Sequence, residues 1–157
     1  GYMADEARRI LVDAGCSRAI VELGGDVALW RREGEKEFSI GVNDPREADG
    51  LFGVLRLRGG AVVTSGDYER FFTIQGQRYA HIIDPRTGRP VARELASVTV
   101  VTPDGMFADA WATAFFVLGW ERTIQLVSEH EELEAVVIHD DGRVHVSEGL
   151  RERFKRR

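Results

Sequence analysis

Apolar residues recur at helical spacing in three main segments of the chain. The first covers residues 2–14 and ends at a glycine, and the longest covers residues 107–118 and is also followed by a glycine. A further helix is expected at residues 120–130. The basic residues from 150 to 157 are predicted to form a short helix with a frayed end.

Strand patterns fill most of the remaining chain. Runs rich in β-branched and aromatic residues, bounded by turn residues, predict strands at 19–23, 27–30, 37–42, 51–57, 61–64, 68–74, 78–83, 95–102, 134–139 and 143–147. Several are joined by hairpin turns, and they do not alternate with helices. The pattern therefore predicts an α+β fold with a largely antiparallel sheet and helices packed on it, and it argues against a Rossmann fold. The length of 157 residues suits a single domain, expected over residues 1–157.

Composition and charge argue against several classes of function. A net charge of −5 lacks the basic footprint of a nucleic-acid binder, so no nucleic-acid partner is expected. The single cysteine, Cys16, cannot form an internal disulfide. The longest apolar run, at residues 110–118, is about half as long as a membrane-spanning helix, so the sequence predicts no transmembrane segment.

Asp109 is the most informative polar residue, because the helix around it is otherwise almost entirely apolar. Burial of an unpaired carboxylate is costly, so Asp109 is expected to have a compensating partner. Thr113 follows four residues later and shares its helix face. A carboxylate and a hydroxyl on one face are oxygen ligands that suit Mg²⁺. The alternative is structural, with Asp109 bonded to an arginine or a backbone group and Thr113 a core hydroxyl.

His81 lies at a predicted strand end, directly before the loop at residues 84–88. A histidine in that place could act as a general base near neutral pH, and the alternative is a partly buried side chain bonded to the loop. Two further clusters, at residues 22–26 and 64–70, contain small residues that let the backbone bend sharply or approach a ligand, or that simply form turns.

Taken in order, these motifs resemble the ApbE family of flavin transferases. The resemblance extends from residue 1 to about residue 147, and its most specific parts are residues 81–90 and 108–119. The matching segments are residues 1–5 (GYMAD), 23–26 (LGGD), 40–42 (IGV), 64–66 (TSG), 78–90 (RYAHIIDPRTGRP), 97–100 (SVTV) and 108–114 (ADAWATA).

This resemblance implies an ApbE-like fold, related to the T-fold, and an enzyme that splits FAD in a Mg²⁺-dependent reaction. Family members transfer FMN through a phosphoester to a Thr or Ser hydroxyl and release AMP. Their target proteins carry an Asp-Gly-x-Ser/Thr-Gly-Ala-Ser/Thr-like segment. Two alternatives stay open: a Mg²⁺-dependent FAD pyrophosphatase that produces FMN and AMP, and a non-catalytic flavin-binding module.

Matching residue by residue to the family motifs assigns expected roles. Asp109 and Thr113 would be metal ligands, Ile83 would line the FAD site through its backbone, and His81 would be a base or a phosphate-orienting group. Asp5 is expected to brace the site rather than to bind metal.

The sequence departs from the family pattern in three respects. Many relatives carry a second acidic residue at the position of Ala112, which implies one metal ligand fewer here, and Glu22 stands where Asn is common. Family members are about twice as long, so the chain is expected to be a C-terminal portion that lacks an N-terminal half. Many relatives are periplasmic or membrane-anchored, which is the location the resemblance implies, through an N-terminal anchor absent here; a cytoplasmic location stays open.

Overall fold

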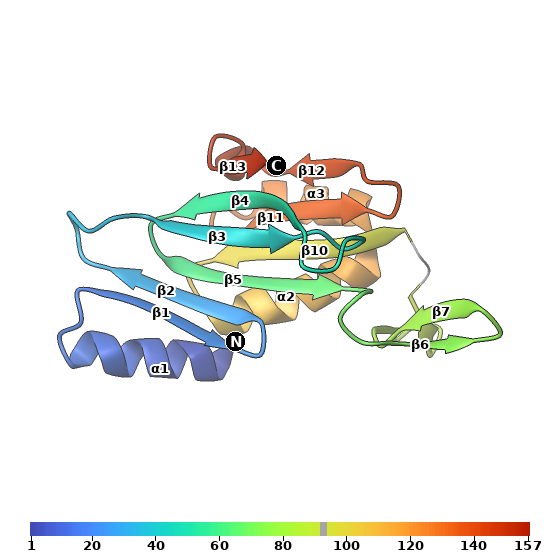
Figure 1. The fold of residues 1–157 in the computed structure, drawn as a ribbon, viewed down its shortest axis with the longest axis horizontal. Coiled ribbons are helices and arrows are strands. Elements are labelled where there is room, and N and C mark those ends of the chain that lie inside the picture. The colour runs from blue at the N-terminus through green and yellow to red at the C-terminus, as the bar shows by residue number, and fades with distance from the viewer. Residues whose placement is uncertain (92–93) are drawn as a thin grey trace.

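The computed structural model describes residues 1–91 and 94–157, with the backbone alone at positions 77 and 78. Its centre is a six-stranded sheet in which all neighbouring strands are antiparallel (Figure 1). In spatial order the strands are β1 (Arg18–Leu23), β2 (Asp26–Arg31), β5 (Gly60–Gly66), β10 (Leu95–Thr102), β11 (Glu134–His139) and β12 (Val144–Val146). The predicted antiparallel α+β fold is therefore confirmed.

Both faces of this sheet are covered, which makes three layers. Helices α2 (Gly105–Leu118) and α3 (Trp120–Glu129) pack on one face, and α1 (Tyr2–Asp13) contacts α2, β1 and β2. The other face carries a three-stranded sheet of β13 (Phe154–Arg156), β4 (Leu51–Leu57) and β3 (Phe38–Asn43).

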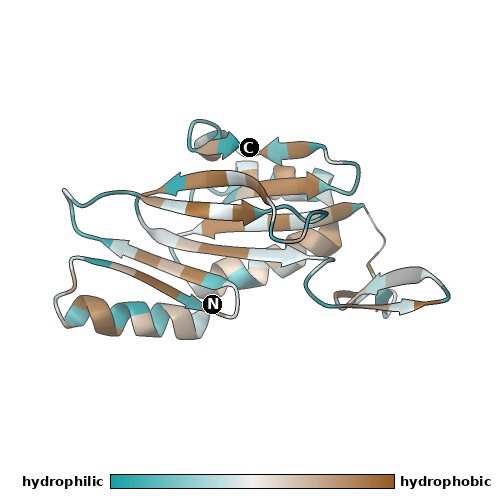
Figure 2. Cartoon of the chain, in the orientation of Figure 1, coloured by the Kyte–Doolittle hydropathy of each residue, from teal (hydrophilic) through white to brown (hydrophobic). Residues whose placement is uncertain are grey.

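The alternation of side chains along the central strands explains this layering. In β5, Val63 joins the core beneath the helices, whereas its neighbour Val62 joins the core beneath the second sheet. Every residue of β10 is buried, because this strand lies in the middle of the central sheet. Figure 2 shows hydrophobic residues on the strands of both sheets, including β10 and β11.

The C-terminal segment differs from the prediction of a frayed helix. It contains a 3₁₀ turn, η1 (Glu148–Leu150), followed by β13, which pairs antiparallel with β4. The four-residue spacing of Leu150 and Phe154 is compatible with a helix, but Leu150 is fully buried beneath the second sheet. Pairing with the open edge of β4 satisfies the backbone of the tail, so a long-range contact overrides the local pattern.

A hairpin of β6 (Phe71–Ile74) and β7 (Gln77–Ala80) projects from the body of the molecule (Figure 1). Gln75 and Gly76 form its turn and both have positive φ angles, 50° and 79°, as a two-residue turn between twisted strands requires. The predicted hairpin is confirmed, with strands shorter than the predicted 68–74 and 78–83. Beyond it, β8 (Ile83–Asp84) pairs with β9 (Arg89–Pro90) around the predicted loop.

Within the described residues, the helices are all too short or too polar to span a lipid bilayer.

Two histidine rings and an indole ring pack together beside α3. His139 is 2% exposed, and its ring lies 5.0 Å from that of His145, which stacks on Trp120 at 4.0 Å. Among the described residues, neither ring nitrogen of His139 has a hydrogen-bond partner. Desolvation lowers the pKa of His139 below 6.5, and the nearby charge of Arg143 acts in the same direction.

This packing predicts a loss of stability in acid. Unfolded chains protonate His139 near pH 6.5, whereas the folded protein does so at a lower pH. The contribution of His139 is therefore complete above about pH 6.5 and is lost as the pH falls below that value. We expect His139→Phe to reduce the difference in unfolding free energy between pH 7.5 and 5.5, measured by urea denaturation. The exposed His130, changed to Phe, is the control, and an unchanged difference in His139→Phe would contradict the prediction.

Candidate functional site

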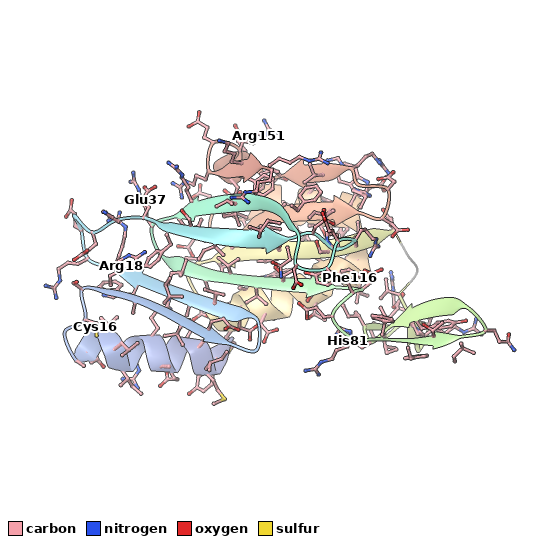
Figure 3. All side chains as sticks on the ribbon, in the orientation of Figure 1. Cys16, Arg18, Glu37, His81, Phe116 and Arg151 are labelled. Carbon is pink, nitrogen blue, oxygen red and sulfur yellow. The ribbon has the colours of Figure 1, made fainter. Side chains whose placement is uncertain are left out.

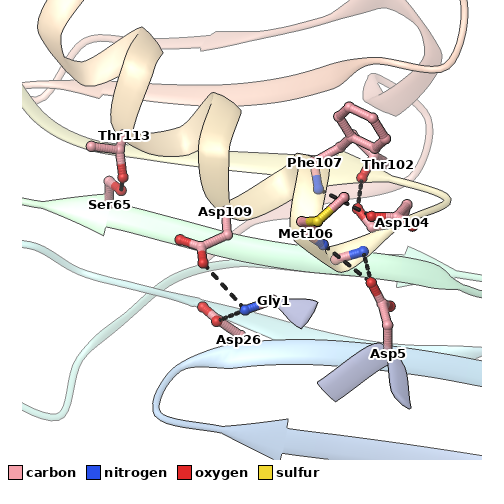
Figure 4. A network of polar contacts seen from close by, with 11 residues as sticks. Gly1, Asp5, Asp26, Ser65, Thr102, Asp104, Met106, Phe107, Asp109 and Thr113 are labelled. Atoms are coloured by element: carbon pink, nitrogen blue, oxygen red, sulfur yellow. Dashed lines mark hydrogen bonds and ion pairs between the residues drawn. The ribbon is translucent and has the colours of Figure 1, made fainter. Parts of the chain in front are cut away.

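Asp109 and Thr113 lie one turn apart on the exposed side of α2 (Figure 4). The Thr113 hydroxyl is 3.2 Å from the hydroxyl of Ser65, which lies near the end of β5. Their predicted shared face is confirmed. The expected burial of Asp109 is wrong, because its side chain is 53% exposed. Apolar residues occur on the outer side of α2 as well as on the side facing the sheet, so the sequence pattern did not distinguish the two.

The amino group of Gly1 lies between two carboxylates. It donates a hydrogen bond to Asp109 Oδ2 at 3.2 Å and another to Asp26 at the start of β2 (Figure 4). A side chain at Gly1 would collide with the backbone of Gly105, so the close approach of α1 to α2 requires glycine here.

Asp5 braces the first turn of α2, as expected from the sequence. Its carboxylate accepts hydrogen bonds from the backbone N–H groups of Gly105 at 2.7 Å and Met106 at 3.1 Å. The same carboxylate forms an ion pair with Arg8 at 2.9 Å. Arg8 in turn donates to three backbone carbonyls of strand ends and loops, those of Leu29, Gly60 and Pro103. These contacts fix the helix that carries Asp109 relative to the sheet.

His81 lies just after β7 at the base of the projecting hairpin, and it is exposed (Figure 3). Its backbone N–H and its Nδ1 both contact the carbonyl oxygen of Arg70, at 3.1 and 2.9 Å. Because a carbonyl can only accept, Nδ1 carries the hydrogen, and Nε2 is the nitrogen that can take up a proton. The alternative of a partly buried histidine bonded to the loop that follows is therefore wrong. Ile83, in β8, is 46% exposed.

The carboxyl of Glu69 is influenced by charges of the hairpin base and of Asp26 in β2. Desolvation raises its pKa, the charges of His81 and Arg70 oppose that rise, and the charge of Asp26 adds to it. In the described part of the chain, however, no hydrogen bond joins His81 to Asp109 or Thr113. The sequence gives no separate signal for Glu69 or Asp26, because each lies in a segment with the composition of a turn.

Ala112 and Glu22 have roles that the sequence left open. Ala112 is fully buried in the core between α2 and the sheet, so its position does not face solvent as Asp109 does. The expectation that Ala112 removes a metal ligand is therefore not supported. Glu22 accepts a hydrogen bond from the backbone N–H of Gly25 at 2.9 Å and so closes the turn before Asp26.

The donor set suits a hard cation. Asp109 offers a carboxylate, and Thr113 adds a hydroxyl one turn along the same exposed helix face. Oxygen ligands of this kind fit Mg²⁺, which keeps several waters in its shell. In the described residues there is no cluster of three or more His, Cys, Asp or Glu side chains that could form a self-contained metal site.

Comparison with known proteins identifies the family. The sequence model of the ApbE family matches residues 1–137. The chain belongs to the ApbE family. A curated relative from Klebsiella pneumoniae (strain 342), named FAD:protein FMN transferase, is 37% identical over 155 residues, which cover 98% of this chain and 48% of the relative. A relative of the same name from Treponema pallidum (strain Nichols) is 38% identical, with 99% and 46% covered.

Solved ApbE structures share the fold. The ApbE protein from Thermotoga maritima superimposes with a TM-score of 0.85 at 38% identity, over 95% of this chain and 49% of the other. The apo flavinyl transferase ApbE from Pseudomonas stutzeri gives a TM-score of 0.77 at 30% identity, over 98% and 48%. The predicted ApbE-like fold is confirmed, and the chain spans about half the length of the relatives it matches.

Proposed function

We propose that residues 1–157 form a single domain, the C-terminal portion of a Mg²⁺-dependent FMN transferase that moves FMN from FAD to a protein hydroxyl. Relatives named FAD:protein FMN transferase match nearly the whole chain. The observation that carries the proposal is the joint exposure of Asp109 and Thr113 on one helix face.

In this reaction the oxygen of a Thr or Ser hydroxyl attacks the phosphorus atom of the FMN half of FAD. A new phosphoester bond forms, the bond from that phosphorus to the bridging oxygen breaks, and AMP leaves with the bridging oxygen. The hydroxyl proton passes to a base. Bound Mg²⁺ would neutralise the negative charge that develops on the pyrophosphate.

The residues of this chain would act from two places, helix α2 and the base of the β6–β7 hairpin. On α2, Asp109 and Thr113 would hold Mg²⁺, and Asp5 keeps that helix in place. On the hairpin side, His81 would take the hydroxyl proton or orient a phosphate through Nε2, and the Ile83 backbone would line the FAD site. The target would present an Asp-Gly-x-Ser/Thr-Gly-Ala-Ser/Thr-like segment.

Replacing His81 tests the base assignment. We expect His81→Ala to lower kcat for FMN transfer about 100-fold, because general bases typically contribute that much or more. The Kd for FAD should change less than about threefold, since the assigned role is in the chemical step. Discontinuous assays of FMN transfer measure kcat, and titration followed by flavin fluorescence measures the Kd for FAD. His130→Ala is the matched control. Equal losses in kcat and in FAD affinity would instead indicate a binding or structural histidine.

The dependence of AMP release on an acceptor peptide distinguishes FMN transfer from FAD hydrolysis. The full-length gene product is incubated with FAD and Mg²⁺, with and without an acceptor peptide, and EDTA is added to a parallel sample. The proposal expects AMP release that requires both the peptide and the metal. Release without the peptide would favour the pyrophosphatase, and FAD binding without any AMP release would favour a non-catalytic module.

A further inference from the structure

We propose that Arg46 is a positioning residue for FMN transfer, which keeps His81 in place by clamping Asp67. This inference rests on the proposed function and concerns how the base that it assigns is held. Arg46 lies outside the segments that carry the family resemblance, in the loop from 44 to 50 between β3 and β4.

The guanidinium of Arg46 joins three parts of the fold. It donates two hydrogen bonds to the carboxylate of Asp67, from Nη1 to Oδ1 at 2.8 Å and from Nη2 to Oδ2 at 3.1 Å. It also donates to Asp140, in the turn between β11 and β12. The loop itself is shaped by Asp44, whose carboxylate accepts from the Arg46 backbone N–H at 2.8 Å. A loop of the second sheet, the end of β5 and the β11–β12 turn are thereby fixed to one another.

Asp67 is a buried carboxylate, with 4% of its side chain exposed. A carboxylate removed from water requires a compensating charge and hydrogen bonds, and the Arg46 guanidinium supplies both. The two parallel hydrogen bonds of a planar guanidinium fix the orientation of a carboxylate as well as its position, whereas a lysine ammonium acts as a point charge. Arg46 therefore determines how the Asp67 side chain is oriented.

Asp67 marks the point where the chain leaves the central sheet. The pairing of β5 with β10 ends at Gly66, which lies opposite Ser97, and the Asp67 backbone N–H donates once more to the carbonyl of Ala96 at 3.1 Å. Four residues after Asp67 the chain enters the β6–β7 hairpin, which projects from the body of the molecule (Figure 1). The clamp thus lies at the base of the hairpin, where a small change in chain direction displaces the residues that follow.

The clamped segment contacts both parts of the candidate site. The carbonyl of Arg70, three residues after the clamp, accepts hydrogen bonds from the backbone N–H and the Nδ1 of His81. Two residues before the clamp, the hydroxyl of Ser65 lies 3.2 Å from that of Thr113 on α2. A shift of this segment would therefore move His81 relative to α2. Arg46 would affect the reaction through the position of His81 and not by contact with the reacting atoms.

A double-mutant cycle with His81 tests this inference in the full-length gene product. We expect Arg46→Lys to lower kcat for FMN transfer at least ~10-fold, because small displacements of a catalytic group are costly in rate. In the His81→Ala background, the same substitution should lower the residual kcat less than about threefold, because the group that it displaces is already absent. Arg46→Lys keeps a positive charge beside Asp67, and thermal melting checks that the fold is retained. The matched control is Arg58→Ala, which removes an exposed ion pair with Glu37 and should retain the full kcat.

The tautomer of His81 provides a readout that does not depend on activity. Isotope labelling of histidine nitrogens and NMR in alkaline buffer, where the rings are neutral, distinguish a hydrogen on Nδ1 from one on Nε2. The signal that is missing in His81→Ala identifies this residue. The unmodified protein should carry the hydrogen on Nδ1, as the contact with the Arg70 carbonyl requires. Arg46→Lys should give a mixture of both tautomers, and Arg58→Ala should not.

The outcomes separate this inference from the proposed function. A loss of kcat in Arg46→Lys that requires His81, together with a mixture of tautomers, supports the positioning role. Full kcat in Arg46→Lys, an equal fold-loss with and without His81, or an unchanged tautomer would overturn it. Absence of FMN transfer by the unmodified gene product would overturn the proposed function, and the tautomer in Arg46→Lys would still decide whether Arg46 holds His81.

Discussion

Asp109→Asn in the full-length gene product is expected to lower the rate of FMN transfer at least ~100-fold. A metal ion that neutralises transition-state charge contributes several kcal/mol, and each 1.36 kcal/mol corresponds to about a factor of ten in rate. The fold should be unaffected, because the Asp109 side chain is 53% exposed and its hydrogen bond is to the amino group of Gly1. Exposed substitutions of this kind change the free energy of unfolding by less than about 0.5 kcal/mol.

Single-turnover transfer rates and urea denaturation of the same preparation measure the two halves of this prediction. The control is Asp13→Asn, on the exposed side of α1, which should retain the full rate of FMN transfer. Full activity in Asp109→Asn would remove Asp109 from the metal site. A large loss of stability would show instead that its carboxylate supports the fold.

Asp5→Ala is expected to produce the largest loss of stability, about 2–4 kcal/mol. The substitution removes two hydrogen bonds to the first turn of α2, and loss of a helix cap costs about 1 kcal/mol. It also leaves Arg8 without its carboxylate, and breaking a largely buried ion pair is strongly destabilising. Asp5 and Arg8 are 13% and 20% exposed, so solvent screens their interaction only weakly.

Urea denaturation monitored by circular dichroism measures this loss. The matched control is Asp13→Ala, on the same helix, whose ion pair with Arg9 is well exposed and should contribute less than about 0.5 kcal/mol. Asp5→Asn should lie between Asp5→Ala and the unmodified protein, because the amide oxygen can still accept from α2. Stability of Asp5→Ala equal to that of Asp13→Ala would contradict the bracing role.

Much of the fold could be predicted because its signals are local. The turn at Gly76 and the helix end at Gly119 are set by residues that tolerate positive φ, so pattern and structure agree there. The C-terminal tail could not be predicted in the same way. Strand β13 forms because β4 offers an open edge. The residues from 150 to 157 contain no local signal for pairing with that distant strand.

The same distinction between local and long-range signals applies to the candidate site. Four-residue spacing placed Asp109 and Thr113 on one helix face, because helix geometry alone determines it. The contacts of Asp26 and Ser65 depend on how β2 and β5 lie against α2, which is a matter of strand order and packing. The burial of Asp109 was overestimated because the apolar residues Met106 and Phe107 of the same helix are themselves exposed.

The intact mass of an acceptor peptide tests the central proposal most directly. The full-length gene product is incubated with FAD, Mg²⁺ and a peptide containing the Asp-Gly-x-Ser/Thr-Gly-Ala-Ser/Thr-like segment, and a second sample contains EDTA. The account predicts that the peptide gains the mass of one FMN phosphoester in the first sample and none in the second. An unmodified peptide in the presence of Mg²⁺ and consumed FAD would contradict it.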